Sequence, residues 1–208
     1  MKQGKPHIFF DFDGLKFNTV PTQTKYLNER WGVNLVPTDY PDGSYYEDTL
    51  NKYLADDKKV TREEVYDDLV ENFLKSREWH EQILPMEGMQ EVMNALAKKH
   101  TLWTVTARQW GGIEMIRYML DKHIPSCITN IHCVWTNKDK VFTSVSKRNF
   151  IESIEGEKIG FIDDSPHEVQ QIQDLIPSYL FDPKGIHDGN AKIINRVRSW
   201  EEIGKIFL

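Results

Sequence analysis

The spacing of hydrophobic positions predicts a chain that alternates between strands and helices over most of its length. A continuous apolar run, Ile8 to Phe10 with Phe12, lies between Pro6 and Gly14 and is typical of a buried central strand. Further strands are predicted at residues 101–106, 131–135, 158–162 and 179–181, and helices at 87–99, 111–123, from 146 through 151, at 166–175 and from 199 onward. Strands separated by helices imply right-handed crossovers, so the pattern predicts an α/β fold with a doubly wound parallel sheet.

Residues 15–84 show helical patterns only. Hydrophobic residues recur at helical spacing from Thr19 to Trp31, before a stop at Gly32. A short helix is expected at residues 47–54. A capping box of Thr61 and Glu64 opens another helix that should run to about residue 79. These patterns predict a small all-helical cap at 15–84, inserted into a core made of residues 1–14 and 85–208.

A long loop is expected between the first two helices of the cap, because residues 33–46 contain prolines, glycine and aspartates. Tyr40, Tyr45 and Tyr46 lie in it. Two interpretations are open for these tyrosines: they line a pocket, or they pack the loop against the rest of the cap.

The composition is that of an ordinary globular protein. The chain has 208 residues, 39% hydrophobic and 28% charged, enough for one α/β domain with a modest insertion. No apolar run approaches the ~20 residues of a spanning helix, and the first residues lead into a strand rather than a signal peptide, so we expect a cytoplasmic protein with no membrane partner. Cys127 and Cys133 are expected to be buried thiols rather than a disulfide.

The formal net charge of -6 argues against a protein that grips a long nucleic-acid backbone, which requires a surplus of lysine and arginine. A small phosphate ester remains compatible with this charge, because the local charge of a site can oppose that of the whole molecule.

Acidic residues follow two of the predicted strands. Asp11 and Asp13 leave the first strand, and Asp163 and Asp164 leave the strand at 158–162. Because the carboxyl ends of parallel strands share one edge of a sheet, these carboxylates should converge there, together with Thr106. Their mutual repulsion then requires a cation, and an all-oxygen donor set favours Mg²⁺ over zinc. The alternative is that both segments are solvated turns rich in Asp and Gly.

The same residues resemble the four ordered motifs of the haloacid dehalogenase (HAD) superfamily. Asp11-Phe-Asp13-Gly14, then Val105-Thr106, then a lysine, then Ile162-Asp163-Asp164 match these motifs over residues 7 to 166. The resemblance implies a phosphatase that depends on Mg²⁺ and forms an aspartyl-phosphate. Asp11 would be the nucleophile, and Asp13 would protonate the leaving alcohol and then deprotonate the attacking water. Aspartate at position 13 favours phosphate ester hydrolysis over dehalogenation.

The resemblance also assigns phosphate-binding groups. Thr106 would donate its hydroxyl to a phosphoryl oxygen, together with backbone N–H groups around Ala107 and Arg108. The motif lysine is taken to be Lys147, with Lys140 as the reserve. Two interpretations of the Arg108 side chain are open: it binds a second anionic group of the substrate, or it forms a surface salt bridge.

The expected metal-binding residues are Asp11, Asp13 and Asp163, with the side chain of Asp13 left free to carry a proton. Asp164 is expected to act through water or to hold Lys147.

These inferences predict a Mg²⁺-dependent phosphomonoesterase acting on a small phosphorylated metabolite, with a nucleotide 5'-phosphate as one example suggested by the cap aromatics. Two rivals are a phosphatase acting on nucleic-acid ends and a non-catalytic relative that uses the cap as a binding surface.

Overall fold

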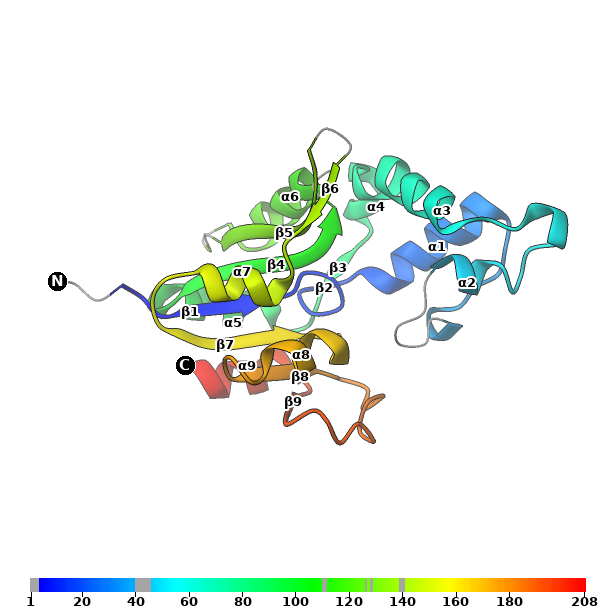
Figure 1. The fold of residues 1–208 in the computed structure, drawn as a ribbon. Coiled ribbons are helices and arrows are strands. Elements are labelled where there is room, and N and C mark those ends of the chain that lie inside the picture. Colours follow the sequence, from blue (N-terminus) through cyan, green and yellow to red (C-terminus); the bar gives the residue numbers. More distant parts are fainter. Residues whose placement is uncertain (1–3, 40–45, 110–111, 126, 128, 139–140) are drawn as a thin grey trace.

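A seven-stranded sheet forms the centre of the molecule (Figure 1). The computed structural model describes residues 4–39, 46–109, 112–125, 127, 129–138 and 141–208. The strand order is β6-β5-β4-β1-β7-β8-β9, and every neighbouring pair is parallel except β5 and β6. The strands are β1 (His7–Phe10), β4 (Thr101–Gln109), β5 (Thr129–Lys138), β6 (Val141–Ser144), β7 (Lys158–Asp163), β8 (Ser178–Phe181) and β9 (Asn195–Val197). This order confirms the predicted α/β class and doubly wound sheet.

The two edge strands, β6 and β9, were not predicted. Both are short, and each adds to a longer neighbour: β6 folds back on β5, and β9 runs parallel to β8. Their strand conformation depends on backbone pairing with that neighbour rather than on a hydrophobic pattern of their own.

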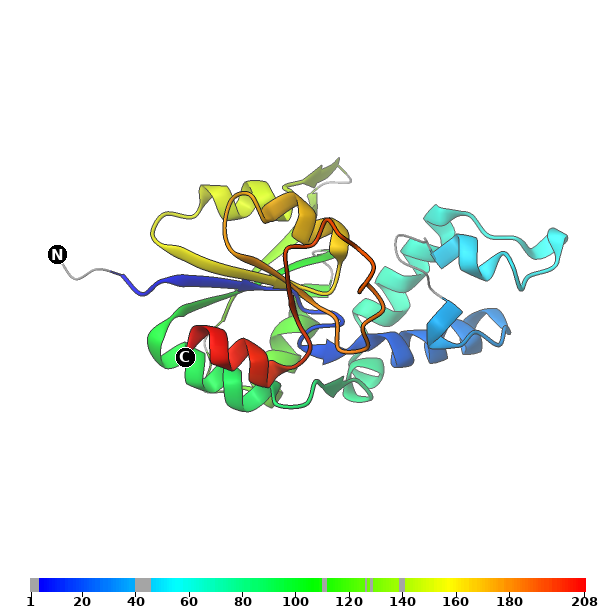
Figure 2. The same ribbon diagram turned by 90° about the horizontal axis from the view of Figure 1, so that it is seen from below.

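Helices cover both faces of the sheet (Figure 2). Two hydrophobic clusters, one on each face, pack the helices against the strands, and neighbouring residues of β1 serve opposite faces: Phe10 belongs to one cluster and Phe9 to the other. On the Phe10 face lie α5 (Met89–Lys99), α6 (Ile113–His123) and α9 (Trp200–Phe207); on the Phe9 face lie α7 (Lys147–Ser153) and α8 (Pro166–Ile172).

The segment between β1 and α5 forms a cap that extends beyond the end of the sheet (Figure 1). Its helices are α1 (Thr19–Trp31), α2 (Tyr46–Leu50), α3 (Arg62–Asp68) and α4 (Arg77–Glu81), with 3-10 turns at Pro37–Asp39 and Asp56–Lys58. The capping box of Thr61 and Glu64 is present at α3. The single helix predicted to run to residue 79 is instead α3, a π-helical turn at Leu69–Leu74, and α4.

The prediction that no strand interrupts the cap segment is wrong at its two ends. β2 (Phe17–Asn18) pairs antiparallel with β3 (Leu84–Pro85), so the chain enters and leaves the cap through a two-stranded ribbon. Sequence patterns miss such strands because they are two residues long. Of the loop tyrosines, Tyr40 and Tyr45 lie outside the described residues.

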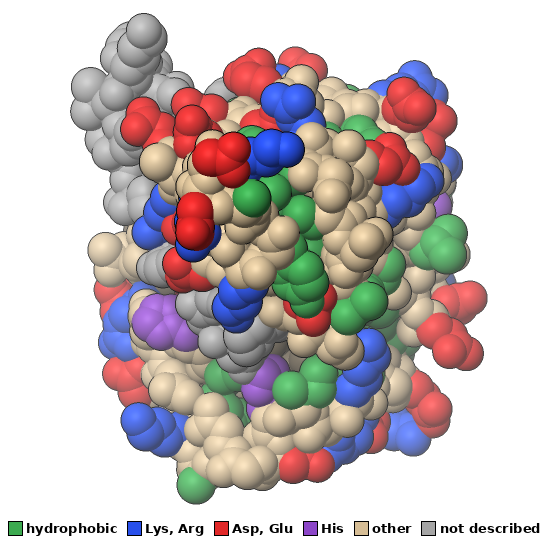
Figure 3. Space-filling view, turned by 90° about the vertical axis from the view of Figure 1, so that its right-hand side faces the viewer, with side chains coloured by type: hydrophobic (Ala, Val, Ile, Leu, Met, Phe, Trp, Pro, Cys, Tyr) green, Lys and Arg blue, Asp and Glu red, His purple; other side chains and the backbone are tan. Residues whose placement is uncertain are grey.

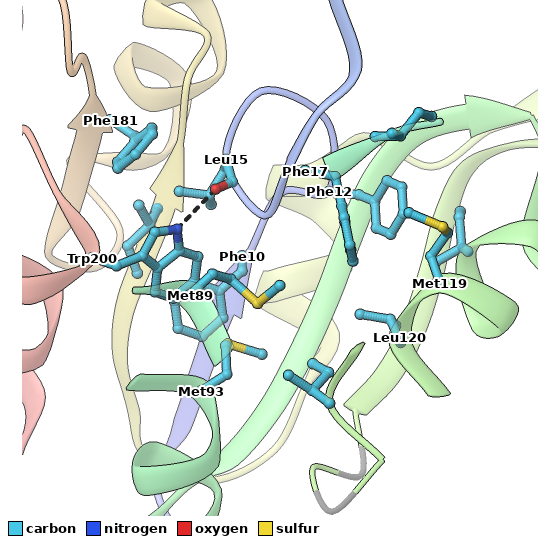
Figure 4. Close-up of a cluster of buried hydrophobic side chains, with 14 of the residues drawn as sticks. Phe10, Phe12, Leu15, Phe17, Met89, Met93, Met119, Leu120, Phe181 and Trp200 are labelled. Atoms are coloured by element: carbon cyan, nitrogen blue, oxygen red, sulfur yellow. Dashed lines mark hydrogen bonds between the residues drawn. The ribbon is translucent and has the colours of Figure 1, made fainter. Parts of the chain in front are cut away.

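The loop that follows β1 is held by contacts from distant parts of the chain. The indole Nε1–H of Trp200 donates to the carbonyl oxygen of Leu15 at 2.9 Å (Figure 4). The backbone N–H of Met86 donates to the carbonyl oxygen of Lys16 at 2.9 Å. The buried Lys16 ammonium donates to the carbonyl oxygen of Asp11 at 2.7 Å. The turn after the strand is therefore shaped by the end of the cap and by the last helix.

Cys127 and Cys133 are both buried free thiols, as predicted. In the part of the chain that the structure describes, no helix combines the length and the apolar composition needed to cross a membrane.

Replacing Trp200 by phenylalanine is expected to lower the free energy of unfolding by about 1–3 kcal/mol, because it leaves the buried Leu15 carbonyl without its donor. Urea unfolding measures this change. Trp31→Phe is the matched control, since among the described residues its buried indole N–H has no hydrogen-bond partner. An equal loss in both variants would contradict the prediction.

Candidate active site

The acidic residues predicted from the strand ends do converge at one edge of the sheet. Phe10 pairs with Thr104 on one side and Ile162 on the other, which aligns the ends of β1, β4 and β7. Asp11, Thr106 and Asp163 line the same cavity of about 380 Å³, which lies between this edge and the cap. The parallel register is therefore the reason that residues far apart in the sequence meet.

Lys147 lies between two of these carboxylates. It is the first residue of α7, which Ser146 caps by accepting a hydrogen bond from the Asn149 N–H. Its buried Nζ donates to Asp11 Oδ1 and to Asp163 Oδ2, both at 2.7 Å. The structure thus places Lys147 where the motif lysine is expected; Lys140 lies outside the described residues.

Asp11, Asp163 and Asp164 form a cluster that fits a hard metal ion. Each offers a carboxylate oxygen, and these oxygens all lie within 4.8 Å of one another. A divalent ion such as Mg²⁺ prefers oxygen ligands of this kind. The donor set of this chain is therefore compatible with the expected metal.

The carboxylates of Asp163 and Asp164 differ in their hydrogen-bond partners. Asp163 Oδ2 accepts from Lys147, and Asp163 Oδ1 accepts from the Ser165 N–H at 2.9 Å. No hydrogen bond from the described residues reaches the Asp164 carboxylate, which lies against Gly14. A Cβ added at Gly14, where φ is +67°, would lie 1.7 Å from Asp164 Oδ2. The Asp164 carboxylate therefore has fewer hydrogen bonds from the described residues than that of Asp163, and the order of the two as metal ligands stays a prediction.

Burial and like charge dominate the titration of the cluster. Burial raises the pKa of Asp11 to about 7, with Lys147 opposing this and Asp163 adding to it. Burial, Asp163 and Asp11 together raise the pKa of Asp164 well above its usual range. Although burial lowers the pKa of Lys147, its carboxylate neighbours outweigh this, and the net shift is upward. A divalent cation in the cluster would favour the ionised carboxylates instead.

Asp13 is held by a second, separate ion pair. Arg108 Nε donates to Asp13 Oδ2 and Arg108 Nη2 donates to Asp13 Oδ1, both at 2.7 Å. The Thr19 hydroxyl also donates to Asp13. Burial raises the pKa of Asp13, but Arg108 and Thr19 outweigh it and hold that pKa below its ordinary value. Asp13 is therefore kept ionised.

Arg108 also reaches the cap. Its Nη1 donates to His80 Nε2 at 2.6 Å, and His80 Nδ1 donates to the Ser76 carbonyl oxygen at 2.7 Å. The proton must lie on Nδ1, because a carbonyl oxygen can only accept. Burial and Arg108 lower the pKa of His80 to about 4, so the ring is neutral. Arg108 thus connects Asp13 in the core to α4 in the cap.

The Arg108 side chain forms an ion pair with Asp13 in which the arginine is buried and the carboxylate is partly exposed; that Arg108 binds a second anionic group of the substrate stays a prediction. The exposed fraction of Arg108 is 7%. The guanidinium also lies over the Phe12 ring, 4.7 Å from the ring centroid. The pair is therefore not the weak, solvated surface salt bridge considered from the sequence.

Thr106, Ala107 and the Arg108 backbone occupy the loop after β4 and line the same cavity as Asp11. The Thr106 side chain is buried, and its oxygen accepts a hydrogen bond from the Arg108 N–H at 3.1 Å. The hydroxyl proton of Thr106 is thus left to donate into the cavity.

Lys16, Thr19 and His80, which contact Asp11, Asp13 or Arg108, were not singled out from the sequence, and neither were Gln23 and Tyr66 of the cavity lining. The position of Lys16 between two hydrophobic residues, Leu15 and Phe17, was a usable indication that this lysine is buried. All three side chains are buried in the structure. Burial lowers the pKa of Lys16 to about 7, with Asp11 opposing. For His80 and Thr19 the pattern held no signal, because their partners lie on other elements.

Asp11→Asn is expected to become more stable relative to the wild type as the pH rises. Because the pKa of Asp11 is raised to about 7 in the folded protein, the folded state binds more protons than the unfolded chain between about pH 4 and 7. The wild type therefore loses stability over this interval, by about 1–4 kcal/mol from this group. The measurement is urea unfolding in EDTA at several pH values.

Asp174→Asn is the control for this experiment, because Arg148 lowers the pKa of that exposed carboxyl. A difference between Asp11→Asn and wild type that stays constant from pH 4 to 8 would contradict the prediction.

The fold was compared with known proteins. No family model matches the sequence, and the search of curated proteins found no match. Solved structures do match over the whole chain. A haloacid dehalogenase-like hydrolase from Streptococcus pneumoniae is 14% identical, with 100% of both chains covered and a TM-score of 0.65.

Two further structures support the same likeness. A HAD-superfamily hydrolase of subfamily IA from Geobacter sulfurreducens is 14% identical, with 100% of this chain and 99% of that chain covered and a TM-score of 0.60. A putative HAD hydrolase from Bacillus subtilis, bound to magnesium, is 16% identical, with 99% of both chains covered and a TM-score of 0.59. The chain has the fold of the haloacid dehalogenase-like hydrolases.

Proposed function

We propose that the protein is a Mg²⁺-dependent phosphomonoesterase that hydrolyses a small phosphorylated metabolite through an aspartyl-phosphate on Asp11. The observation that carries the proposal is the meeting of Asp11, Asp163, Asp164 and Lys147 at the buried end of the cavity. Structures with the same fold include a putative phosphoglycolate phosphatase from Lactobacillus plantarum and a putative β-phosphoglucomutase from Thermotoga maritima.

Asp11 and Asp164 would hold the metal ion, with Asp163 beside them and Asp13 as a further expected contributor. When bound, Mg²⁺ neutralises the repulsion between the carboxylates and a dianionic phosphate and orients the two groups. Without this neutralisation the pKa values raised by burial would favour the protonated, non-nucleophilic form of Asp11.

In the first half-reaction one carboxylate oxygen of Asp11 attacks phosphorus, and the bond from phosphorus to the leaving alcohol oxygen breaks. Asp13, in its protonated form, gives a proton to that oxygen. Lys147 and the Thr106 hydroxyl bind the phosphoryl oxygens, together with backbone N–H groups near Ala107. In the second half-reaction Asp13 takes a proton from water, and the resulting hydroxide attacks phosphorus and releases Asp11 and inorganic phosphate.

The ion pair with Arg108 favours one of the two roles of Asp13. An ionised Asp13 is ready to accept a proton from water, whereas only its protonated form, which the ion pair disfavours, can give a proton to the leaving oxygen. The first half-reaction should therefore be slow for poor leaving groups, which need protonation, and fast for good ones.

A small substrate fits the surface better than a nucleic acid does. The cap end of the molecule carries acidic and basic side chains in mixed clusters with hydrophobic ones between them (Figure 3). A protein that follows a phosphate backbone needs a broad basic face. A nucleotide 5'-phosphate is one small metabolite that this proposal includes.

Asp11→Asn is expected to lower kcat by at least about 10³-fold on the best substrate of a phosphorylated-metabolite panel, because the amide cannot form the covalent intermediate. Phosphate release with Mg²⁺ present is the readout, and Asp174→Asn is the control. Normal turnover by Asp11→Asn would exclude the covalent mechanism.

Asp13→Asn is expected to lower kcat by about 10²–10⁴-fold on ethyl phosphate, whose leaving group needs a proton. On 4-nitrophenyl phosphate the first half-reaction should be less affected, so the aspartyl-phosphate should accumulate and be detectable by mass spectrometry of acid-quenched protein. Equal losses on both esters, with no accumulation, would argue against the acid–base role.

Asp164→Asn is expected to raise the Mg²⁺ concentration for half-saturation by about tenfold or more, because it removes the most available ligand. The Mg²⁺-induced rise in Tm measures binding without relying on activity. A larger effect from Asp163→Asn would restore the ligand order expected from the sequence.

A further inference from the structure

The cavity has two chemically different ends. The end at the sheet edge is charged and contains Asp11, Asp13, Lys147 and the remaining acidic residues. The other end is the inner surface of the cap, which we call the cap wall. Its members are Val20 and Gln23 from α1, Tyr46 from α2, Tyr66 from α3, and Leu69, Val70, Phe73 and Leu74 from the π-helical turn. The leaving group of a bound ester would lie against this wall, because the phosphate belongs with Asp11.

Every basic side chain that lines the cavity, among the described residues, is already paired. Lys147 is held by Asp11 and Asp163, and Arg108 by Asp13 and His80. The cap wall itself contributes no basic side chain in the described ranges. A second anionic group on the substrate would therefore lose its hydration without gaining a counterion.

Aromatic rings give the cap wall a preference for flat molecules. The Tyr46 and Tyr66 rings lie 6.2 Å apart, at an interplanar angle of 58°. Phe73 is buried beside them in the wall. A flat apolar ring bound against these side chains would bury apolar surface area and would also make favourable contacts with the aromatic rings.

Gln23 supplies one polar group with a defined direction. The Tyr46 hydroxyl donates to Gln23 Oε1 at 3.1 Å, which fixes the amide. No hydrogen bond from the amide nitrogen to another described residue competes with a ligand. The amide N–H₂ can therefore donate to an acceptor on the leaving group.

From these observations, and resting on the proposed phosphomonoesterase function, we infer that the substrate is a phosphate monoester of an uncharged alcohol with a flat, largely apolar ring that carries a hydrogen-bond acceptor. The cavity volume of about 380 Å³ lies at the lower end of the range of small-molecule sites. Esters whose leaving group carries a carboxylate or a second phosphate are disfavoured.

The test compares kcat/KM with Mg²⁺ for three groups of esters. Uridine 5'-phosphate and adenosine 5'-phosphate carry a ring with acceptors, phenyl phosphate carries a plain ring, and phosphoglycolate and glucose 1,6-bisphosphate carry a second anionic group. The ring-bearing esters are expected to exceed the last group by at least about tenfold, since 1.4 kcal/mol is tenfold. A preference for the second-anion esters would overturn the inference but leave the phosphatase function standing; no turnover of any ester would overturn the function itself.

Two variants test the cap wall directly. Tyr66→Ala is expected to lower the ratio of kcat/KM for phenyl phosphate to kcat/KM for ethyl phosphate about tenfold. Tyr53→Ala is the control and should leave this ratio unchanged, because Tyr53 is an exposed tyrosine of the cap that does not line the cavity. Val70→Lys adds the missing cation and should raise kcat/KM for phosphoglycolate about tenfold. If Tyr66→Ala left the ratio for phenyl over ethyl phosphate unchanged and Val70→Lys left kcat/KM for phosphoglycolate unchanged, the cap wall would not be the surface that contacts the leaving group.

Gln23→Leu tests the acceptor. The variant is expected to lower kcat/KM for the two nucleotides about tenfold more than for phenyl phosphate, because only the nucleotide bases offer acceptors to the amide. Equal effects on all three esters would show that Gln23 does not bind the leaving group.

Discussion

The structure depends on a buried lysine that lies between two carboxylates. Lys147 brings one positive charge to a position where Asp11 and Asp163 would otherwise repel each other in a poorly solvated pocket. The balance is incomplete, because burial still raises the pKa of Asp11 and of Asp164. The cluster of Asp11, Asp163 and Asp164 therefore offers carboxylate oxygens that are compatible with a divalent cation.

The two carboxylates of the first motif, Asp11 and Asp13, have different basic partners. Asp11 shares the lysine and the acidic cluster, whereas Asp13 is turned toward Arg108. Arg108 in turn donates to His80 of α4, so the ion pair that holds Asp13 also contacts the cap. The core therefore positions Asp11, and the cap takes part in positioning Asp13.

The cap and the core line different parts of the same cavity. Its wall is apolar and aromatic except for Gln23, and the two basic residues at the charged end are already paired. The substrate preference that we infer rests on this pairing, because a second negative charge on a ligand would find no free basic side chain among the described residues that line the cavity.

The sheet, the cap and the edge where the acidic residues meet could be predicted from the amino-acid sequence, because hydrophobic periodicity reports each element and the crossover rule fixes how consecutive strands are joined. The sequence also singled out Lys147 from its place in the motif order. The partners of Arg108 and His80, and the different contacts of the Asp163 and Asp164 carboxylates, became known from the three-dimensional structure. These depend on side chains that meet across separate elements, and burial there sets both their charge and their contacts.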